Sequence, residues 1–411
     1  MDRRSFLEKL GICSAVIASP ASSSLQPLPF QTPDWEVIRK QFPLNTSRAY
    51  FNNGTFGPSP YPVLNSLTEN FMKINQAGEY GSTKTARERI AQFIGCEKSE
   101  ISLTHNTTEG INVICAGLQL HKGDEVIISL QEHVGNALPW IYRSKKDGII
   151  LKTFQPASTK AATIQRIKNL ITRKTRVIAI PHITCTTGQV LPISEIGDLA
   201  KKKKIFTAID GAHGAGMLDL DIQSLNVDFY ASCCHKWMLG PGGTGFLYVN
   251  DNLLDVVSPT FVGAYSDTGW ELNASPPYFK GFVPSAHRYD FGTQSSALYS
   301  GVSAAVDFHM GIGKNYIESR IKNLSQIFLQ GLLKMPEKYS ILTPQESDSR
   351  AGMITFLPKK MSNVSLNKIL SKEGFRLRLV PESDLDAIRA SFHIYNSESE
   401  IDSLLSVLRK V

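Results

Sequence analysis

The sequence lacks the features that mark several classes of protein. It has 6 cysteines in 411 residues, which excludes a disulfide-rich scaffold. Its 44 basic and 37 acidic residues leave a formal net charge of +7, too mild over this length to suggest a nucleic-acid-binding protein. No apolar run approaches the roughly 20 residues of a membrane-spanning helix. With 42% apolar and 20% charged residues, the composition is that of a large globular protein of two domains, or of one domain with an added lobe.

The first 25 residues have the layout of an export signal. A charged start is followed by a short apolar run, Leu10–Ala18, and then by small residues. The motif Arg3-Arg4-Ser5-Phe6-Leu7 resembles a twin-arginine signal, with Asp2 in place of the more usual Ser or Thr. An ordinary frayed N-terminus is the alternative. We therefore expect a signal peptide over residues 1–25, contact with the twin-arginine translocation machinery, a periplasmic or otherwise exported protein, and no stable membrane insertion after cleavage.

Strand-like apolar runs alternate with helical patterns from about residue 60 onward. The predicted strands are Glu125–Leu130, Ile149–Phe154, Arg176–Ile180, Ile205–Ile209, Phe229–Ala231 and Gly245–Val249. The pattern favours an α/β protein whose mostly parallel sheet is covered by helices on both faces. A stretch rich in proline and glycine, Ser275–Pro284, interrupts this pattern. We predict a large domain with an N-terminal arm over residues 26–285 and a smaller α+β domain over residues 286–411.

Three short motifs occur in an informative order. Asn106-Thr107-Thr108 opens an apolar helix, and hydroxyls with free N–H groups at a helix start suit an anion, ideally a phosphate. Asp210 follows an apolar strand, at the position where α/β sheets bind ligands. Lys236, in Ser232–Trp237, lies in an apolar, glycine-flanked context, and a desolvated lysine has a lowered pKa and can form a Schiff base.

Simpler explanations exist for each motif. The threonines could act as plain N-caps, and Asp210 could be a turn residue that caps the next element. Gly240–Gly245 matches G-x-G-x-x-G, but it precedes a strand, whereas a dinucleotide-binding loop follows a strand and opens a helix. A zinc site could be built from Cys233, Cys234, His235 and His213. Adjacent cysteines supply tetrahedral geometry poorly and the usual C-x-x-C spacing is missing, so we expect no metal.

Taken together, the motifs resemble those of the fold-type-I pyridoxal-phosphate enzymes, and more narrowly of the class-V aminotransferase family. That family includes cysteine desulfurases and isopenicillin N epimerase-like proteins. The resemblance extends from Tyr50–Thr55 to Arg389–Tyr395. It implies pyridoxal 5'-phosphate as cofactor and three catalytic residues. Lys236 forms the Schiff base and moves protons at the substrate Cα, Asp210 pairs with the pyridinium nitrogen so that the ring stays an electron sink, and His133 stacks on the ring.

The resemblance also assigns the remaining cofactor contacts. Thr107, Thr108 and His235 are expected to hold the phosphate, and His213 is expected to line the site. Thr293 matches a threonine that reaches the phosphate of a neighbouring subunit. This implies a homodimer with shared active sites.

Two further residues are expected to contact the substrate. Arg389 matches the arginine that receives the α-carboxylate, which a guanidinium fork fits bidentately. Asn53 is expected to contribute beside it. The alternatives are a surface arginine for Arg389 and, for His133, a loop histidine without a role in the site.

The sequence departs from the cysteine desulfurases at three positions. Their sulfur-accepting cysteine lies shortly before the carboxylate-binding arginine, yet no cysteine follows Cys234 here. Cys185 stands where they have an asparagine near the phenolic oxygen of the cofactor. Cys233 stands where they have a phosphate-binding serine. A cysteine desulfurase is therefore not expected.

The predicted activity is exported chemistry at the α-carbon of an amino acid or an amino-acid-derived metabolite. Amino-group transfer is the first expectation, while epimerisation and C–S or β-elimination use the same residues and stay open. A catalytically silent scaffold that binds a partner would tolerate loss of Lys236 or Asp210, and both are present. Specificity is expected from three segments, Asn52–Phe56, Tyr265–Phe282 and Arg376–Glu382.

Overall fold

The computed structural model describes residues 33–45 and 47–411. The predicted signal peptide and the twin-arginine motif lie outside the described residues. Within the described part, no helix is long and apolar enough to cross a bilayer.

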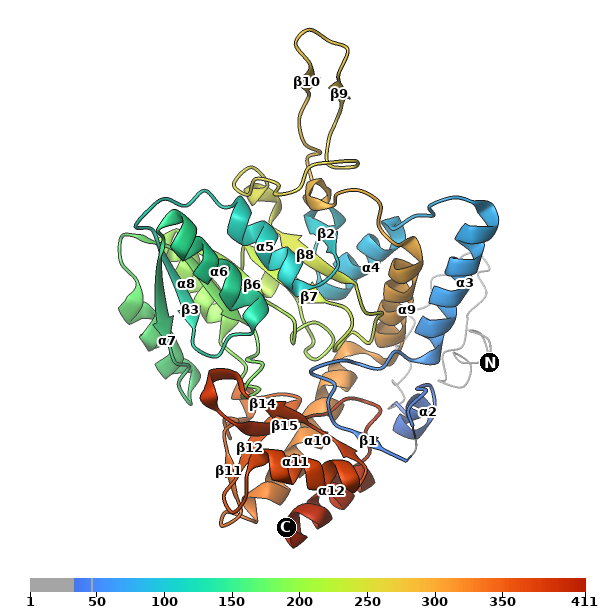
Figure 1. Cartoon of the computed structure of the whole chain (residues 1–411), viewed down its shortest axis with the longest axis vertical. Coiled ribbons are helices and arrows are strands. Elements are labelled where there is room, and N and C mark those ends of the chain that lie inside the picture. The colour runs from blue at the N-terminus through green and yellow to red at the C-terminus, as the bar shows by residue number, and fades with distance from the viewer. Residues whose placement is uncertain (1–32, 46) are drawn as a thin grey trace, which may run out of the picture.

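The larger part of the molecule is built on a seven-stranded sheet (Figure 1). Its strand order is β2-β8-β7-β6-β5-β3-β4, in which β8 runs antiparallel to both neighbours and the other pairs are parallel. The strands are β2 (Ile101–Thr104), β3 (Glu125–Ser129), β4 (Ile150–Phe154), β5 (Thr175–Pro181), β6 (Phe206–Asp210), β7 (Phe229–Cys233) and β8 (Gly245–Val249). Six of them match predicted strands within one or two residues. The sequence pattern missed β2, which forms one edge of the sheet.

Both faces of this sheet are buried, which confirms the predicted fold class. Along β5, Val177 and Ala179 belong to one apolar cluster, while Ile178 and Ile180 belong to another. Side chains alternate between the faces of a strand, so the two clusters lie on opposite faces. The covering helices are α4 (Lys84–Ile94), α5 (Thr107–Gly117), α6 (Val134–Asp147), α7 (Lys160–Leu170), α8 (Ile193–Lys203) and α9 (Ser296–Ile312).

The C-terminal part is built on a separate four-stranded antiparallel sheet of order β11-β12-β15-β14. Its strands are β11 (Tyr339–Ile341), β12 (Met353–Pro358), β14 (Arg378–Val380) and β15 (Ala387–Ser391), and its helices are α10 (Lys314–Leu333), α11 (Asn363–Lys372) and α12 (Glu398–Lys410).

The N-terminal segment packs on both parts of the molecule: its strand joins the C-terminal part, and its long helix packs against α9, which covers the large sheet. It contains α2 (Trp35–Arg39), β1 (Ala49–Tyr50) and α3 (Tyr61–Ala77). β1 pairs in parallel with β13 (Phe375–Arg376), and Phe51 lies in the same apolar cluster as Leu324 and Phe356. The chain therefore returns its own beginning to the C-terminal sheet. The domain boundary at residues 285/286 stays a prediction.

A two-stranded hairpin projects from the molecule (Figure 1). It consists of β9 (Trp270–Glu271) and β10 (Tyr278–Phe279), which pair antiparallel within the predicted specificity segment Tyr265–Phe282. Its aromatic side chains are exposed.

Candidate functional site

Asp210 and Lys236 meet at the carboxyl ends of two neighbouring parallel strands. Asp210 is the last residue of β6, and Lys236 follows the end of β7. The Asp210 side chain is buried, and its Oδ1 accepts a hydrogen bond of 2.9 Å from the backbone N–H of Ala212. Among the described residues, no donor binds its Oδ2. This oxygen is free to accept a hydrogen bond from a ligand.

The backbone of the lysine loop is held by a turn from the N-terminal segment. Gly57 N–H donates to the His235 carbonyl at 2.8 Å, and Asn53 Nδ2 donates to the Lys236 carbonyl at 3.4 Å. A Cβ at position 57 would lie 1.8 Å from the Lys236 carbonyl oxygen, so only glycine permits this approach. Asn53 Oδ1 in turn accepts from the Tyr395 hydroxyl at 3.0 Å. The structure thus places Asn53 against the backbone of Lys236, and a contact with substrate stays a prediction.

His133 begins α6 as its N-cap, and its Nδ1 accepts from Gly135 N–H at 3.0 Å. Burial, followed by the positive charge of Lys236, lowers the pKa of His133, so its ring is neutral at neutral pH. A Cβ at position 135 would lie 2.4 Å from Thr108 Oγ1 and 3.1 Å from His133 Nδ1. The starts of α5 and α6 therefore converge.

Two buried polar groups at this point have no hydrogen-bond partner among the described residues. They are Thr107 Oγ1, at the start of α5, and His235 Nδ1, beside Lys236. Burial, and then the Lys236 charge, lowers the pKa of His235 to about 4. A buried polar atom without a partner is unfavourable, and a phosphate at the N-terminus of α5 would satisfy both groups. The residues present therefore fit the phosphate of pyridoxal phosphate.

Arg389 is a buried cation without a carboxylate partner among the described residues. Its side chain is 1% exposed, which rules out the alternative of a surface arginine. One guanidinium nitrogen, Nη1, donates to the Cys185 carbonyl, while Nε and the neighbouring Ser391 hydroxyl have no partner. Burial, and then the charge of Arg378, lowers the pKa of Arg389 to about 10. An unpaired buried charge is costly, so this geometry suits an external carboxylate.

His213 is oriented by a residue that the motif analysis did not single out. Trp237 Nε1 donates to His213 Nδ1 at 2.9 Å, and both side chains are buried. The pKa of His213 is held well below its usual value by burial and by the charges of Lys236 and Arg389. The ring is therefore neutral, with its proton on Nε2. The position of Trp237 directly after the lysine was the one sequence signal for this role.

Other site residues were also missed. Glu132 is buried beside His133, and burial raises its pKa well above the usual value. The Gln131 Oε1 atom accepts from the hydroxyls of Thr186 and Thr187, which fixes the loop near Cys185. Because these contacts join segments distant in sequence, spacing alone carried no signal for them.

Thr293 does not join this group of residues. It is exposed and lines a separate cavity of about 520 Å³ together with Arg87 and His287. Its predicted contact with a neighbouring subunit stays a prediction. Among residues 33–45 and 47–411, no three His, Cys, Asp or Glu side chains are placed to hold a metal ion.

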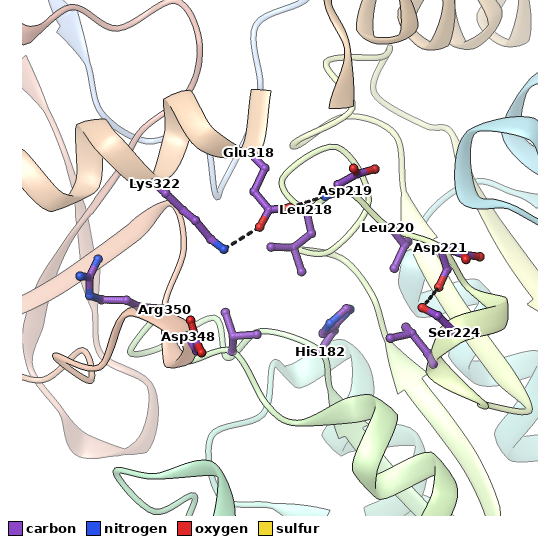
Figure 2. A pocket seen from close by; sticks show the side chains of 12 residues that line it. His182, Leu218, Asp219, Leu220, Asp221, Ser224, Glu318, Lys322, Asp348 and Arg350 are labelled. Atoms are coloured by element: carbon purple, nitrogen blue, oxygen red, sulfur yellow. Dashed lines mark hydrogen bonds and ion pairs between the residues drawn. The ribbon is translucent and has the colours of Figure 1, made fainter. Parts of the chain in front are cut away.

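A smaller cavity of about 230 Å³ lies between α10 and the loops that follow β5 and β6 (Figure 2). His182, Lys322 and Arg350 are among its lining residues. Its charges are engaged locally: Glu318 pairs with Lys322 at 2.6 Å and accepts from the Asp219 backbone N–H at 2.6 Å. Neither cavity includes Lys236, so the candidate site is defined by its residues and not by these hollows.

The fold and the site together define a class. The structure matches the cystine C-S lyase C-DES with a TM-score of 0.82 and 28% identity, covering 90% of this chain and 99% of that one. In another structure of C-DES, which matches with the same score, glycine is covalently linked to its PLP cofactor. These matches place the architecture in fold type I of the pyridoxal-phosphate enzymes, as the sequence predicted.

The chain belongs to the aminotransferase class-V family, which it matches over residues 66–404. It is 27% identical to a probable cysteine desulfurase of Pyrococcus abyssi, over 92% of this chain and 97% of that protein. It is 26% identical to isopenicillin N epimerase of Amycolatopsis lactamdurans, over 92% of this chain and 98% of that protein. The family predicted from the motifs is confirmed.

Proposed function

We propose that this protein is a pyridoxal-phosphate enzyme that acts at the α-carbon of an amino acid. One observation carries the proposal: Lys236 and Asp210 lie together at the carboxyl ends of β7 and β6, with the buried, unpaired Arg389 beside them. Pyridoxal 5'-phosphate is the cofactor, as the family and the cofactor of C-DES support. When bound, it supplies an electron sink that acidifies the Cα–H bond of an attached amino acid.

The residues of this chain have separable tasks. Thr107, Thr108 and His235 would hold the phosphate at the start of α5, and His133 would lie against the ring. Asp210 would hold a proton on the ring nitrogen through its free Oδ2. A neutral His133 adds no positive charge that would compete for Asp210.

Substrate binding and proton movement fall to Arg389 and Lys236. Arg389 binds the α-carboxylate with its unpartnered guanidinium nitrogens and so orients the Cα–H bond. The Lys236 amine takes and returns the proton at Cα. The Cys185 carbonyl and the buried surroundings fix the arginine, so that little of its side-chain freedom is lost when the substrate arrives.

Among the reactions open to these residues, we propose amino-group transfer as the activity. C–S or β-elimination is the second candidate, because C-DES, a cystine C-S lyase, shares the fold over 99% of its chain. A cysteine desulfurase is disfavoured because the segment before Arg389, which the structure describes in full, contains no cysteine.

The test uses the cofactor-loaded enzyme with a panel of amino acids and no amino acceptor, with products identified by mass. Transfer predicts one equivalent of 2-oxo acid per active site, whereas elimination predicts many turnovers with ammonia release and epimerisation predicts the mirror-image amino acid. The Lys236→Ala variant should be silent in every assay. An enzyme that neither retains the cofactor nor changes any amino acid would refute the proposal.

We also propose export by the twin-arginine route and a homodimer that shares its active sites. Support for export comes from Arg3-Arg4 in the sequence, and support for the dimer comes from the match of Thr293 to the family threonine and from its exposure. Replacement of both arginines by lysine should retain the protein in the cytoplasm, as judged by cell fractionation. A monomer in sedimentation equilibrium, at concentrations where the enzyme is active, would contradict the dimer.

A further inference from the structure

Two arginines face each other at the candidate substrate site. Arg378 on β14 and Arg389 on β15 are direct partners in the antiparallel register. Directly opposed residues of an antiparallel pair lie on the same face of the sheet, with Cβ atoms about 4.5–5.5 Å apart. Like charges in this position repel each other, and the Arg378 charge contributes to the lowered pKa of Arg389. The fold therefore holds two guanidinium groups together at a cost in stability.

The carboxylate of Glu382 offsets part of the positive charge of Arg378 and Arg389. Glu382 accepts from both terminal nitrogens of Arg378, with Nη1 to Oε2 at 3.1 Å. The two side chains are 24% and 25% exposed, which places them at the mouth of the site rather than in its floor. Burial alone would raise the pKa of Glu382, but the hydrogen bond from Arg378 and the charges of Arg378 and Arg389 lower it. The charges of Glu382 and Arg378 also act on His133, so this ion pair lies within electrostatic reach of the predicted cofactor ring.

The turn that carries Glu382 is strained and anchored. Ser383, Asp384 and Asp386 adopt φ values of 55°, 54° and 44°, which are unfavourable for residues other than glycine. Ser383 Oγ donates to the Leu130 carbonyl at 2.9 Å, in the loop that leads to His133. A strained turn persists only where its surroundings hold it. Here the turn positions the Glu382 carboxylate so that it accepts hydrogen bonds from Arg378.

We propose that Arg378 binds a second carboxylate of the substrate, so that the enzyme takes amino acids with an acidic side chain. Arg389 receives the α-carboxylate and Arg378 the distal one. Glu382 occupies the Arg378 fork until the substrate replaces it. This inference rests on the proposed function, because it assumes an amino-acid substrate at Arg389.

The test compares the cofactor-loaded enzyme on matched substrates, L-glutamate against L-glutamine and L-aspartate against L-asparagine. The wild type should prefer an acid over its amide. Arg378→Gln should lower kcat/KM for the acid by about 10- to 100-fold, the range for one charged hydrogen-bonded contact, and change the amide by less than about threefold. The control is Arg173→Gln, which removes an exposed arginine outside the three predicted specificity segments. Glu382→Gln should lower KM for the acid severalfold, because the internal competitor is weakened.

A binding measurement makes the inference independent of turnover. Calorimetric titration with glutarate should give tighter binding than with butyrate, and Arg378→Gln should abolish the difference. Equal loss for acid and amide in Arg378→Gln, or equal binding of glutarate and butyrate to the wild type, would overturn the inference. If glutarate binding depends on Arg378 but no amino acid reacts, the proposed function fails, and what remains of this inference is a carboxylate-binding site at Arg378. If amino acids react without an acidic preference, only this inference fails.

Discussion

Trp237→Phe isolates one hydrogen bond in the candidate site. The substitution keeps an aromatic ring against His393, whose ring centroid lies 5.7 Å from that of Trp237 in a stacked arrangement. It removes the Nε1–H that donates to His213 Nδ1 at 2.9 Å. The carbonyl of Trp237, which binds the imidazoles of His309 and His393, is backbone and stays in place. His213 Nδ1 is then buried without a donor, which should lower the free energy of unfolding by about 1–3 kcal/mol.

The same change should alter catalysis, because the ring of His213 loses the contact that fixes its tautomer and orientation. We expect kcat to fall by about 10-fold or more, as for other losses of orientation at a reacting centre. With Nδ1 released, a proton can bind there, so the acidic limb of the kcat–pH profile should move to higher pH. The wild-type limb should lie lower, since the pKa of His213 is held well below its usual value.

Trp140→Phe is the matched control. Trp140 is also fully buried and donates its Nε1–H to Asn136 Oδ1 at 3.3 Å, but it lies in the apolar cluster between α6 and the sheet. Urea unfolding should show comparable losses in the two variants, and only Trp237→Phe should change kcat and its pH profile. Equal stability losses with an unchanged profile in both variants would refute the positioning role of Trp237.

Three further predictions follow from contacts in the same structure. Gly57→Ala should cost about 1–3 kcal/mol in unfolding free energy and weaken cofactor retention, because its Cβ would meet the Lys236 carbonyl at 1.8 Å; Gly242→Ala, whose Cβ would meet no atom closer than 3.8 Å, should be neutral in the same denaturation and absorbance measurements. Burial opposes the ionisation of Asp290, but hydrogen bonds from His287 and Arg87 lower its pKa, so the stability that Asp290 contributes should be present above the usual carboxyl pKa of about 4 and be lost as the pH falls below it. Asp290→Asn should remove this pH dependence and cost about 3 kcal/mol in unfolding free energy, because it leaves Arg87 unpaired. Unfolding curves that do not change with pH would contradict this prediction. The five described thiols should form no persulfide when the enzyme is given cysteine; Cys185, for example, is buried, and its pKa is raised to about 11. Detection of a persulfide at any of them by mass spectrometry would support a cysteine desulfurase.

The sequence predicted the fold class from local patterns, and it predicted the cofactor from the resemblance of its motifs to a known family. Buried parallel strands are continuous apolar runs, and five of the predicted runs form the parallel part of the large sheet. β2 was missed because a four-residue strand, Ile101–Thr104, is too short to show a period. The return of β1 to β13 was missed for a different reason: a two-residue parallel pairing across more than 300 residues leaves no trace in either segment.

The candidate site divides in the same way. Lys236, Asp210 and Thr107 were predicted because each stands at or near a strand or helix end, where short motifs are recognisable, and His133 was predicted from the family resemblance. The orientation of His213 by Trp237 depends on side-chain packing and was not predictable. The surface alternative for Arg389 was wrong because β12 and β14 flank β15 and bury it.

The sequence by itself determined the architecture through its periodicity, and the family and the cofactor through motifs that resemble those of the class-V enzymes. Only the tertiary structure decided which charges face one another. The opposition of Arg378 and Arg389 arises from strand register, and Glu382 reaches Arg378 only through a turn whose backbone is strained. Register and turn geometry are set by the packing of the whole C-terminal sheet. Our proposal that Arg378 binds a second carboxylate therefore rests on the tertiary structure and not on the sequence.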